Sequence, residues 1–142
     1  MTARAVPKNC PFNMKILNEN PPMLKKILDA GMNPNLDTVI FSYGDTIYNP
    51  GRRDIPDELI EHELTHMRQQ GNNPDAWWDR YIKEPYFRLN QEIEAYTAQY
   101  DFICQKVKDR NQRLRILLQL VNVVAGPTYG NMISCLDAHN LI

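Results

Sequence analysis

The sequence predicts an α+β fold in which a short sheet precedes a mostly helical chain. Two observations lead to this prediction: β-rich segments punctuated by proline and glycine lie within the first 50 residues, and helical periodicity dominates from about residue 54 onward. At 142 residues with 43% hydrophobic side chains, the chain can bury about 68–70% of its unfolded surface around one core. We therefore expect a single domain spanning residues 1–142.

The sheet is predicted from three short segments. Residues 14–17 form a possible first strand, and residues 22–31 form a short helix with proline near its start and glycine at its end. Residues 38–43 and 46–48 are rich in β-branched and aromatic side chains and are separated by Gly44-Asp45, as in a hairpin or a bulged strand.

A longer helix is predicted next, between Asp54 and Gly71. Asp54 is the candidate N-cap, Pro56 stands in the first turn, and Gly71 is a natural C-terminal stop. Acidic side chains near the start would stabilise this helix, because they lie at the positive end of its dipole.

Three further helices are expected after this one. The first begins near Asp75, the second runs from Pro85 to about Val107, and the third runs from about Arg113 to Ala125. The most apolar stretch, residues 114–125, is about 12 residues long, short of the roughly 18 that suggest a membrane span. We expect it to be a core helix.

Two of the three histidines lie one helical turn apart. His62 and His66 share a face of the helix predicted over 54–71, and Glu63 lies about 100° around the axis from His62. Two imidazoles at this spacing can reach one zinc ion, and the adjacent carboxylate can take a proton from a metal-activated water. Two ordinary core histidines are the alternative, but the glutamate at the required position favours a metal site. The third histidine, His139, is most simply a surface residue.

A third ligand is sought on the helix that begins at Pro85. Its candidates, Glu92 and Glu94, lie about 200° apart around the helix axis and cannot face the same way. Glu92 shares its face with apolar side chains, where a carboxylate is costly unless it meets a cation or a metal. Glu92 is therefore the predicted ligand and Glu94 a solvated or supporting acid, although an ion pair between Glu92 and Arg88 would also explain the buried position.

These two helices together resemble a known family. The sequences HELTH at residues 62–66 and QEIEAY at residues 91–96 resemble the gluzincin zinc metallopeptidases, in particular small single-domain metallopeptidases of bacteria and phages. The resemblance covers roughly residues 38–107. It implies a zincin-like fold with Zn²⁺ held by His62, His66 and Glu92, and with Glu63 as general base and acid.

One position departs from the family pattern. Tyr96 stands where many gluzincins carry the acid that orients the first histidine. Ligand histidines usually need such an acceptor for their second ring nitrogen. Glu94, Asp101 or a backbone carbonyl would have to supply it.

The substrate side of the site is less specified by the sequence. Zincins of this type place an edge strand over the cleft, for which Phe41 through Tyr48 is the candidate, with a plain structural hairpin as the alternative. Tyr129, on a glycine-flanked turn, is the first candidate for the donor to the oxyanion, and Tyr43, Tyr48 and Arg88 compete with it.

The expected function is zinc-dependent hydrolysis of a peptide or protein substrate. The alternative is a non-catalytic binding or assembly protein on a zincin scaffold, such as a phage particle or tail component. With 16 basic and 17 acidic residues, the chain gives little support for a nucleic-acid or anionic-membrane partner.

The cysteines and the N-terminal sequence indicate the compartment. The three cysteines (Cys10, Cys104 and Cys135) fit reduced thiols in a cytosol, and the N-terminus lacks the apolar run of an export signal. We expect a cytoplasmic protein, or a virion-associated one if it is encoded by a phage. Cys10 could in principle cap the zinc as a thiolate, although a free thiol is the simpler interpretation.

Overall fold

The computed structural model describes residues 13–142 and has the α+β architecture predicted from the sequence. Its N-terminal part contains strand β1 (Lys15–Leu17), helix α1 (Leu24–Asp29) and the hairpin strands β2 (Phe41–Tyr43) and β3 (Thr46–Tyr48). All four elements lie inside the predicted segments. Gly44 in the hairpin turn has φ of +62°, a conformation that glycine adopts without strain. Cys10 lies outside the described residues.

The three strands form a sheet with β3 in the centre. β1 pairs with β3 in parallel, and β2 pairs with β3 in antiparallel register, so β2 is an edge strand. The Lys15 N–H donates to the Asp45 carbonyl, and the Asn49 N–H donates to the Leu17 carbonyl. Because peptide groups alternate in direction along a strand, Ile47 of β3 also faces β1, and its neighbours Thr46 and Tyr48 face β2. By the same alternation, the N–H and C=O of Ser42 point away from β3, toward the free edge.

The rest of the described chain is helical. The elements in order are α2 (Asp57–Gln70), α3 (Pro74–Lys83), α4 (Pro85–Lys106), α5 (Arg110–Val124), the 3₁₀ turn η1 (Pro127–Tyr129) and α6 (Cys135–Leu141). None of the helices in residues 13–142 combines the length and apolar character needed to cross a bilayer. Cys104 and Cys135 are free thiols.

The predicted N-cap of the central helix is wrong. α2 begins at Asp57, and the capping position belongs to Pro56, whose φ of −66° and ψ of 159° are extended. With Asp54 as the N-cap, Ile55 would be the first helical residue. Ile55 precedes Pro56, and proline disfavours helical backbone in the residue before it, so the helix begins later. Asp57 and Glu58 in the first turn still provide the favourable charge at the positive end of the dipole.

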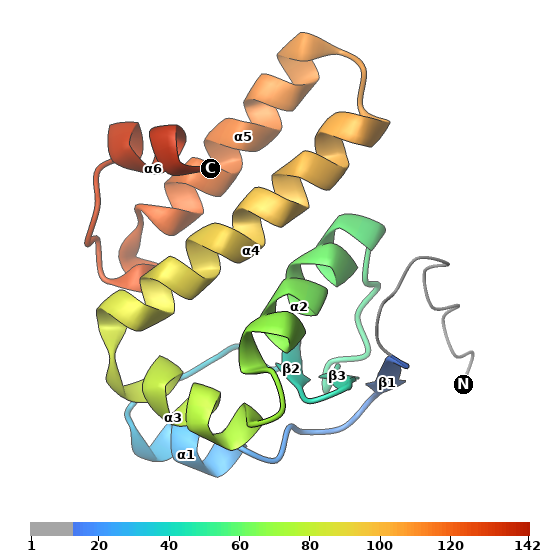
Figure 1. Ribbon diagram of the computed structural model, residues 1–142, viewed down its shortest axis with the longest axis vertical. Coiled ribbons are helices and arrows are strands. Elements are labelled where there is room, and N and C mark those ends of the chain that lie inside the picture. The colour runs from blue at the N-terminus through green and yellow to red at the C-terminus, as the bar shows by residue number, and fades with distance from the viewer. Residues whose placement is uncertain (1–12) are drawn as a thin grey trace.

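Helix α2 lies between the small sheet and α4, as Figure 1 shows. Its buried Ile60, Leu64 and Met67 pack against Ile47 in the central strand. The opposite face of α2, carrying His62 and His66, turns toward α4. With both faces covered, the two histidines are held between the sheet layer and the helical layer.

Helices α1 and α3 cover one end of this arrangement. Trp77 and Trp78 of α3 are buried with Ile27 of α1 and Phe41 of β2, so both tryptophans are core residues. The Trp78 indole Nε1–H donates to the Ser42 carbonyl at 2.9 Å, and Gln70 Nε2 donates to the same oxygen at 2.9 Å. These two side chains cover the outward-facing carbonyl of the edge strand and fix β2 against α2 and α3.

Helix α5 only partly matches the expected core helix. It packs beside α4 (Figure 1) and buries Leu117, Val121 and Val124, but Leu114 and Leu118 are about half exposed. α5 therefore contributes one buried face to the core.

Candidate metal centre

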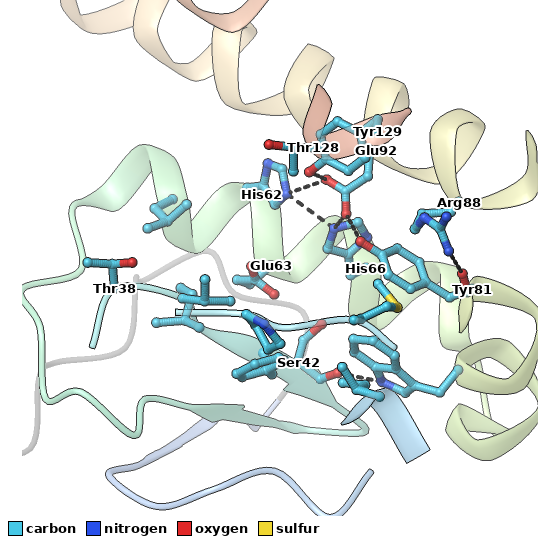
Figure 2. Close-up of a pocket in the computed structure, with 18 of the residues that line it drawn as sticks. Thr38, Ser42, His62, Glu63, His66, Tyr81, Arg88, Glu92, Thr128 and Tyr129 are labelled. Carbon is cyan, nitrogen blue, oxygen red and sulfur yellow. Dashed lines mark hydrogen bonds and ion pairs between the residues drawn. The ribbon is translucent and has the colours of Figure 1, made fainter. Parts of the chain in front are cut away.

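Three buried side chains from two helices converge on one point. The Nε2 atoms of His62 and His66 on α2 lie 3.1 Å apart, and the Glu92 carboxylate on α4 places one oxygen 3.2 Å from His62 Nε2 and the other 3.0 Å from His66 Nε2. All three side chains are at most 6% exposed. Figure 2 shows them meeting at the wall of a pocket. The three residues thus form a group that could hold a metal ion.

The histidine rings are oriented by two glutamine side chains. His66 Nδ1 lies 2.8 Å from Gln69 Oε1, and His62 Nδ1 lies 3.0 Å from Gln99 Oε1. Gln69 Nε2 also donates to the Gln91 carbonyl, which fixes its amide with the oxygen toward the ring. Because an amide oxygen only accepts, His66 Nδ1 carries a proton, and in the neutral ring the Nε2 lone pair faces Glu92. Gln99 Oε1 lies in the same way beside His62 Nδ1, but no second hydrogen bond within residues 13–142 fixes the Gln99 amide as the Gln91 carbonyl fixes that of Gln69.

Two tyrosine hydroxyls hold the Glu92 carboxylate. Tyr81 Oη donates to Oε1 at 2.9 Å, and Tyr129 Oη donates to Oε2 at 3.1 Å. Burial, followed by the negative charge of Glu92, raises the pKa of both hydroxyls, so they stay protonated and donate. Tyr96 packs its ring edge-on against His62, with ring centroids 4.5 Å apart. The carboxylate that faces the histidines is thereby fixed in position.

The charges of the histidines and of Glu92 stabilise one another. Burial lowers the pKa of His66, but the neighbouring Glu92 carboxylate outweighs it and raises the pKa to about 9. Burial alone would raise the pKa of Glu92, but the two histidines hold it well below its usual range. A proton on His66 supplies the positive charge that the buried Glu92 carboxylate needs, and a bound metal ion would take the place of that proton.

The geometry and chemistry of the donors fit a tetrahedral metal ion. Nitrogen and oxygen ligands at about 2.0–2.1 Å from a tetrahedral zinc lie about 3.3–3.4 Å from one another. The two ring nitrogens, 3.1 Å apart, are close to this spacing, and the 3.0 and 3.2 Å separations reach two different oxygens of Glu92. With one ligand atom from each residue, the three atoms lie within 4.8 Å of one another. Two imidazoles and one carboxylate also form one of the ligand sets that catalytic zinc sites use.

Glu63 lies beside the three converging side chains. It is 6% exposed on α2 and faces the pocket between His62 and Ser42 of β2 (Figure 2). Burial raises the pKa of the Glu63 carboxyl, although the nearby histidines oppose this effect. A carboxylate with a raised pKa is well suited to accept and return a proton near neutral pH.

A cavity of about 640 Å³ opens in front of these groups. Residues 38–42, which lead into and form most of the edge strand, lie along one side, and Arg88, Thr128 and Tyr129 lie on the other. The cavity also has apolar lining from Ile27, Met32 and Val39. Its size is within the range of pockets that bind small molecules or short peptide segments.

Sequence reasoning placed the third carboxylate on the correct helix face. Glu92 is buried in the cluster, whereas Glu94 is exposed and lines a separate surface groove with Asp101. The alternative ion pair between Glu92 and Arg88 is absent from the ion pairs of residues 13–142, where Glu92 pairs with the two histidines.

The suggested supporting partners of the histidines were wrong. Neither Glu94, Asp101 nor a backbone carbonyl accepts from the rings; Gln99 and Gln69 do so instead. Gln99 lies seven residues after Glu92, two helical turns along the same face, and Gln69 lies three residues after His66. These spacings are the signals that could have identified both amides.

The oxyanion-donor candidates separate in space. Tyr129 and Arg88 line the cavity, whereas the Tyr43 hydroxyl donates to Asp75 at 2.9 Å and Tyr48 packs in the core around the tryptophans. Tyr129 and Arg88 therefore remain candidates by position.

If the three converging side chains bind zinc, replacing Gln69 with methionine is expected to weaken that binding about 10- to 100-fold, the cost typical of losing a partner that orients a ligand histidine. Methionine is similar in size to glutamine but cannot accept from His66 Nδ1. Competition with a chromophoric chelator measures the affinity. Gln105→Met, at an exposed position of α4, is the control and should bind zinc like the original protein. Equal affinity of the Gln69 and Gln105 variants would contradict the assigned orienting role.

Comparisons of the chain with protein-family models, with curated proteins and with solved structures find no match. The zincin-like subclass and the gluzincin resemblance therefore stay predictions based on the residues of α2 and α4. The α+β architecture and the group of His62, His66 and Glu92 stand on the structure itself.

Proposed function

We propose that this protein is a zinc-dependent hydrolase of peptide bonds. The observation that carries the proposal is the convergence of His62, His66 and Glu92 at one side of a cavity that also contains the buried carboxylate of Glu63. Two histidines and a carboxylate leave a fourth tetrahedral position for water or substrate. A zinc ion bound there supplies a water of lowered pKa and polarises the substrate carbonyl.

The residues of this chain have distinct roles in the proposed reaction. Glu63 accepts a proton at its carboxylate and later delivers it to the leaving amine. Gln69 and Gln99 keep the Nε2 atoms of the histidines directed at the metal. Tyr129 is the proposed donor to the oxyanion because its hydroxyl lies at the cavity; the proton that it donates to Glu92 would turn to the oxyanion during the reaction.

The edge strand supports a peptide as the substrate. β2 and the residues before it border the cavity, and the Ser42 N–H points away from β3, toward the outer edge of the sheet. An extended peptide can pair with such an edge through main-chain hydrogen bonds. Because Gln70 and Trp78 already occupy the Ser42 carbonyl, pairing at this residue would use its N–H.

Metal analysis combined with a cleavage assay tests the proposal. Purified protein is expected to contain about one zinc per chain and to cleave unfolded casein. A chelator should abolish this cleavage, and added zinc should restore it. Protein that binds zinc without cleaving casein or a library of short peptides would instead support the non-catalytic binding or assembly role, and protein without affinity for zinc would overturn the metal site.

A further inference from the structure

Arg88 lies in the cavity with only part of its guanidinium group occupied. It is half-buried on α4, one turn before Glu92. Its Nη1 donates to the carbonyls of Tyr81 and Ile82 at the end of α3, at 2.7 and 3.2 Å. These bonds use both Nη1 protons and fix the position of the guanidinium group.

The other edge of the Arg88 guanidinium, formed by Nε and Nη2, has no hydrogen-bond acceptor among residues 13–142. No carboxylate in this part of the chain lies within ion-pair distance of Arg88 either. Arg80 provides the comparison: its Nε and Nη2 hold both oxygens of Glu84, at 2.9 and 3.2 Å. This edge of arginine matches the two oxygens of a carboxylate. Arg88 thus has an unused carboxylate-binding edge.

The charge balance of the cavity favours an anionic group on the substrate. Arg53 and Arg88 balance Glu63 and Glu92 in its lining, so a bound divalent cation leaves an excess of positive charge. Arg53 already donates to the carbonyls of Thr38 and Asp54 through Nη1 and Nε, and it is exposed. Arg88 is the more buried of the two cations.

Tyr81 connects Arg88 with the metal-binding group. The ring centroid of Tyr81 lies 5.7 Å from Arg88 Cζ and 6.4 Å from the centroid of the His66 ring. Tyr81 thus lies between the histidines and Arg88. A peptide substrate bound over the histidines needs only a few residues to pass Tyr81 and reach Arg88.

We propose that Arg88 binds a carboxylate of the substrate close to the scissile bond. This inference rests on the proposed function and specifies its substrate class: a peptide with either a free C-terminal carboxylate or an acidic side chain next to the cleaved bond. The two sources present the same two oxygens to the guanidinium. A free terminus would make the protein a carboxypeptidase, and an acidic side chain would make it an endopeptidase selective for Asp or Glu.

Three versions of one short peptide test the inference and separate the two sources. They carry a free C-terminal carboxylate, a C-terminal amide, or the amide together with a glutamate beside the expected cleavage site. Binding to the zinc-loaded protein is measured by calorimetry, and cleavage is measured by mass spectrometry. The original protein is expected to favour at least one carboxylate peptide over the neutral amide by about ten- to a hundred-fold.

Arg88→Gln is expected to reduce this preference to about one, and Arg88→Lys should retain part of it because the charge remains. Arg80→Gln, which removes an arginine already paired with Glu84, should keep the original preference. Circular dichroism establishes that each variant is folded, and Arg88→Lys provides the test if Arg88→Gln does not fold.

Two kinds of negative result remain distinguishable. Equal binding of all three peptides by the original protein, or an unchanged preference in the folded Arg88 variants, would overturn the role of Arg88 even if cleavage occurs. Preferential binding of a carboxylate peptide that is lost in Arg88→Gln, without any cleavage, would support the role of Arg88 while counting against the proposed hydrolysis.

Discussion

Replacing Glu63 with glutamine is expected to leave zinc bound and to reduce peptide hydrolysis by about 10²–10⁴-fold, the usual contribution of a general acid–base group. The substitution removes the charge that accepts the proton but keeps the size of the side chain. Glu63 is outside the group of three converging donors, so the zinc content should not change. Metal analysis and the rate of peptide cleavage, measured on the same preparation, check both parts of the expectation.

Glu61→Gln is the matched control for this experiment. Glu61 lies on α2, two residues before Glu63, and is outside the lining of the cavity. The control should retain both zinc and hydrolysis. If Glu63→Gln hydrolysed peptides as fast as Glu61→Gln, Glu63 could not be the general base, and the reaction would need another proton acceptor.

Regular helix geometry explains why the three converging residues could be predicted. His62 and His66 lie on the same face of any helix that includes both, and Glu92 belongs to the apolar face of its own helix. Neither inference needs the tertiary structure. What the sequence could not supply is the way α2 and α4 cross, which brings the two faces within hydrogen-bonding distance.

The residues that support the site depend on that crossing. Gln99 reaches His62 from the other helix, and Tyr81 reaches Glu92 from a third helix. Glutamine and tyrosine side chains are common on helix surfaces, so only their neighbours reveal a role. For this reason the sequence alone favours acidic residues such as Glu94 as partners of the histidines, although Glu94 is exposed.

In the sheet, too, local sequence predicts one feature, the hairpin, but not the order of the strands. The turn at Gly44-Asp45 predicted the hairpin of β2 and β3. The parallel pairing of β1 with β3 requires a connection through α1, and it places β3 in the centre. Only this order makes β2 the edge strand beside the cavity, so the sequence could suggest the hairpin but not which of its strands would be free.

Replacing Glu92 with glutamine is expected to lower zinc affinity by more than the 10- to 100-fold that the loss of an orienting partner costs. A neutral amide is a much weaker ligand for zinc than a carboxylate. Glutamine keeps the volume of the buried side chain, and its Oε1 can still accept from a tyrosine hydroxyl, so the fold should survive. Competition with a chromophoric chelator measures the affinity, and circular dichroism checks the fold.

Thermal unfolding gives a second readout of the same change. A ligand present at a thousand times its dissociation constant stabilises the folded state by about 4 kcal/mol, so zinc should raise the melting temperature of the original protein. Glu94→Gln, two residues along α4 and exposed, should keep this increase, and Glu92→Gln should lose most of it. Because the two glutamates face opposite sides of the helix, a larger loss in the Glu94 variant would mean that the third ligand had been assigned to the wrong face of α4.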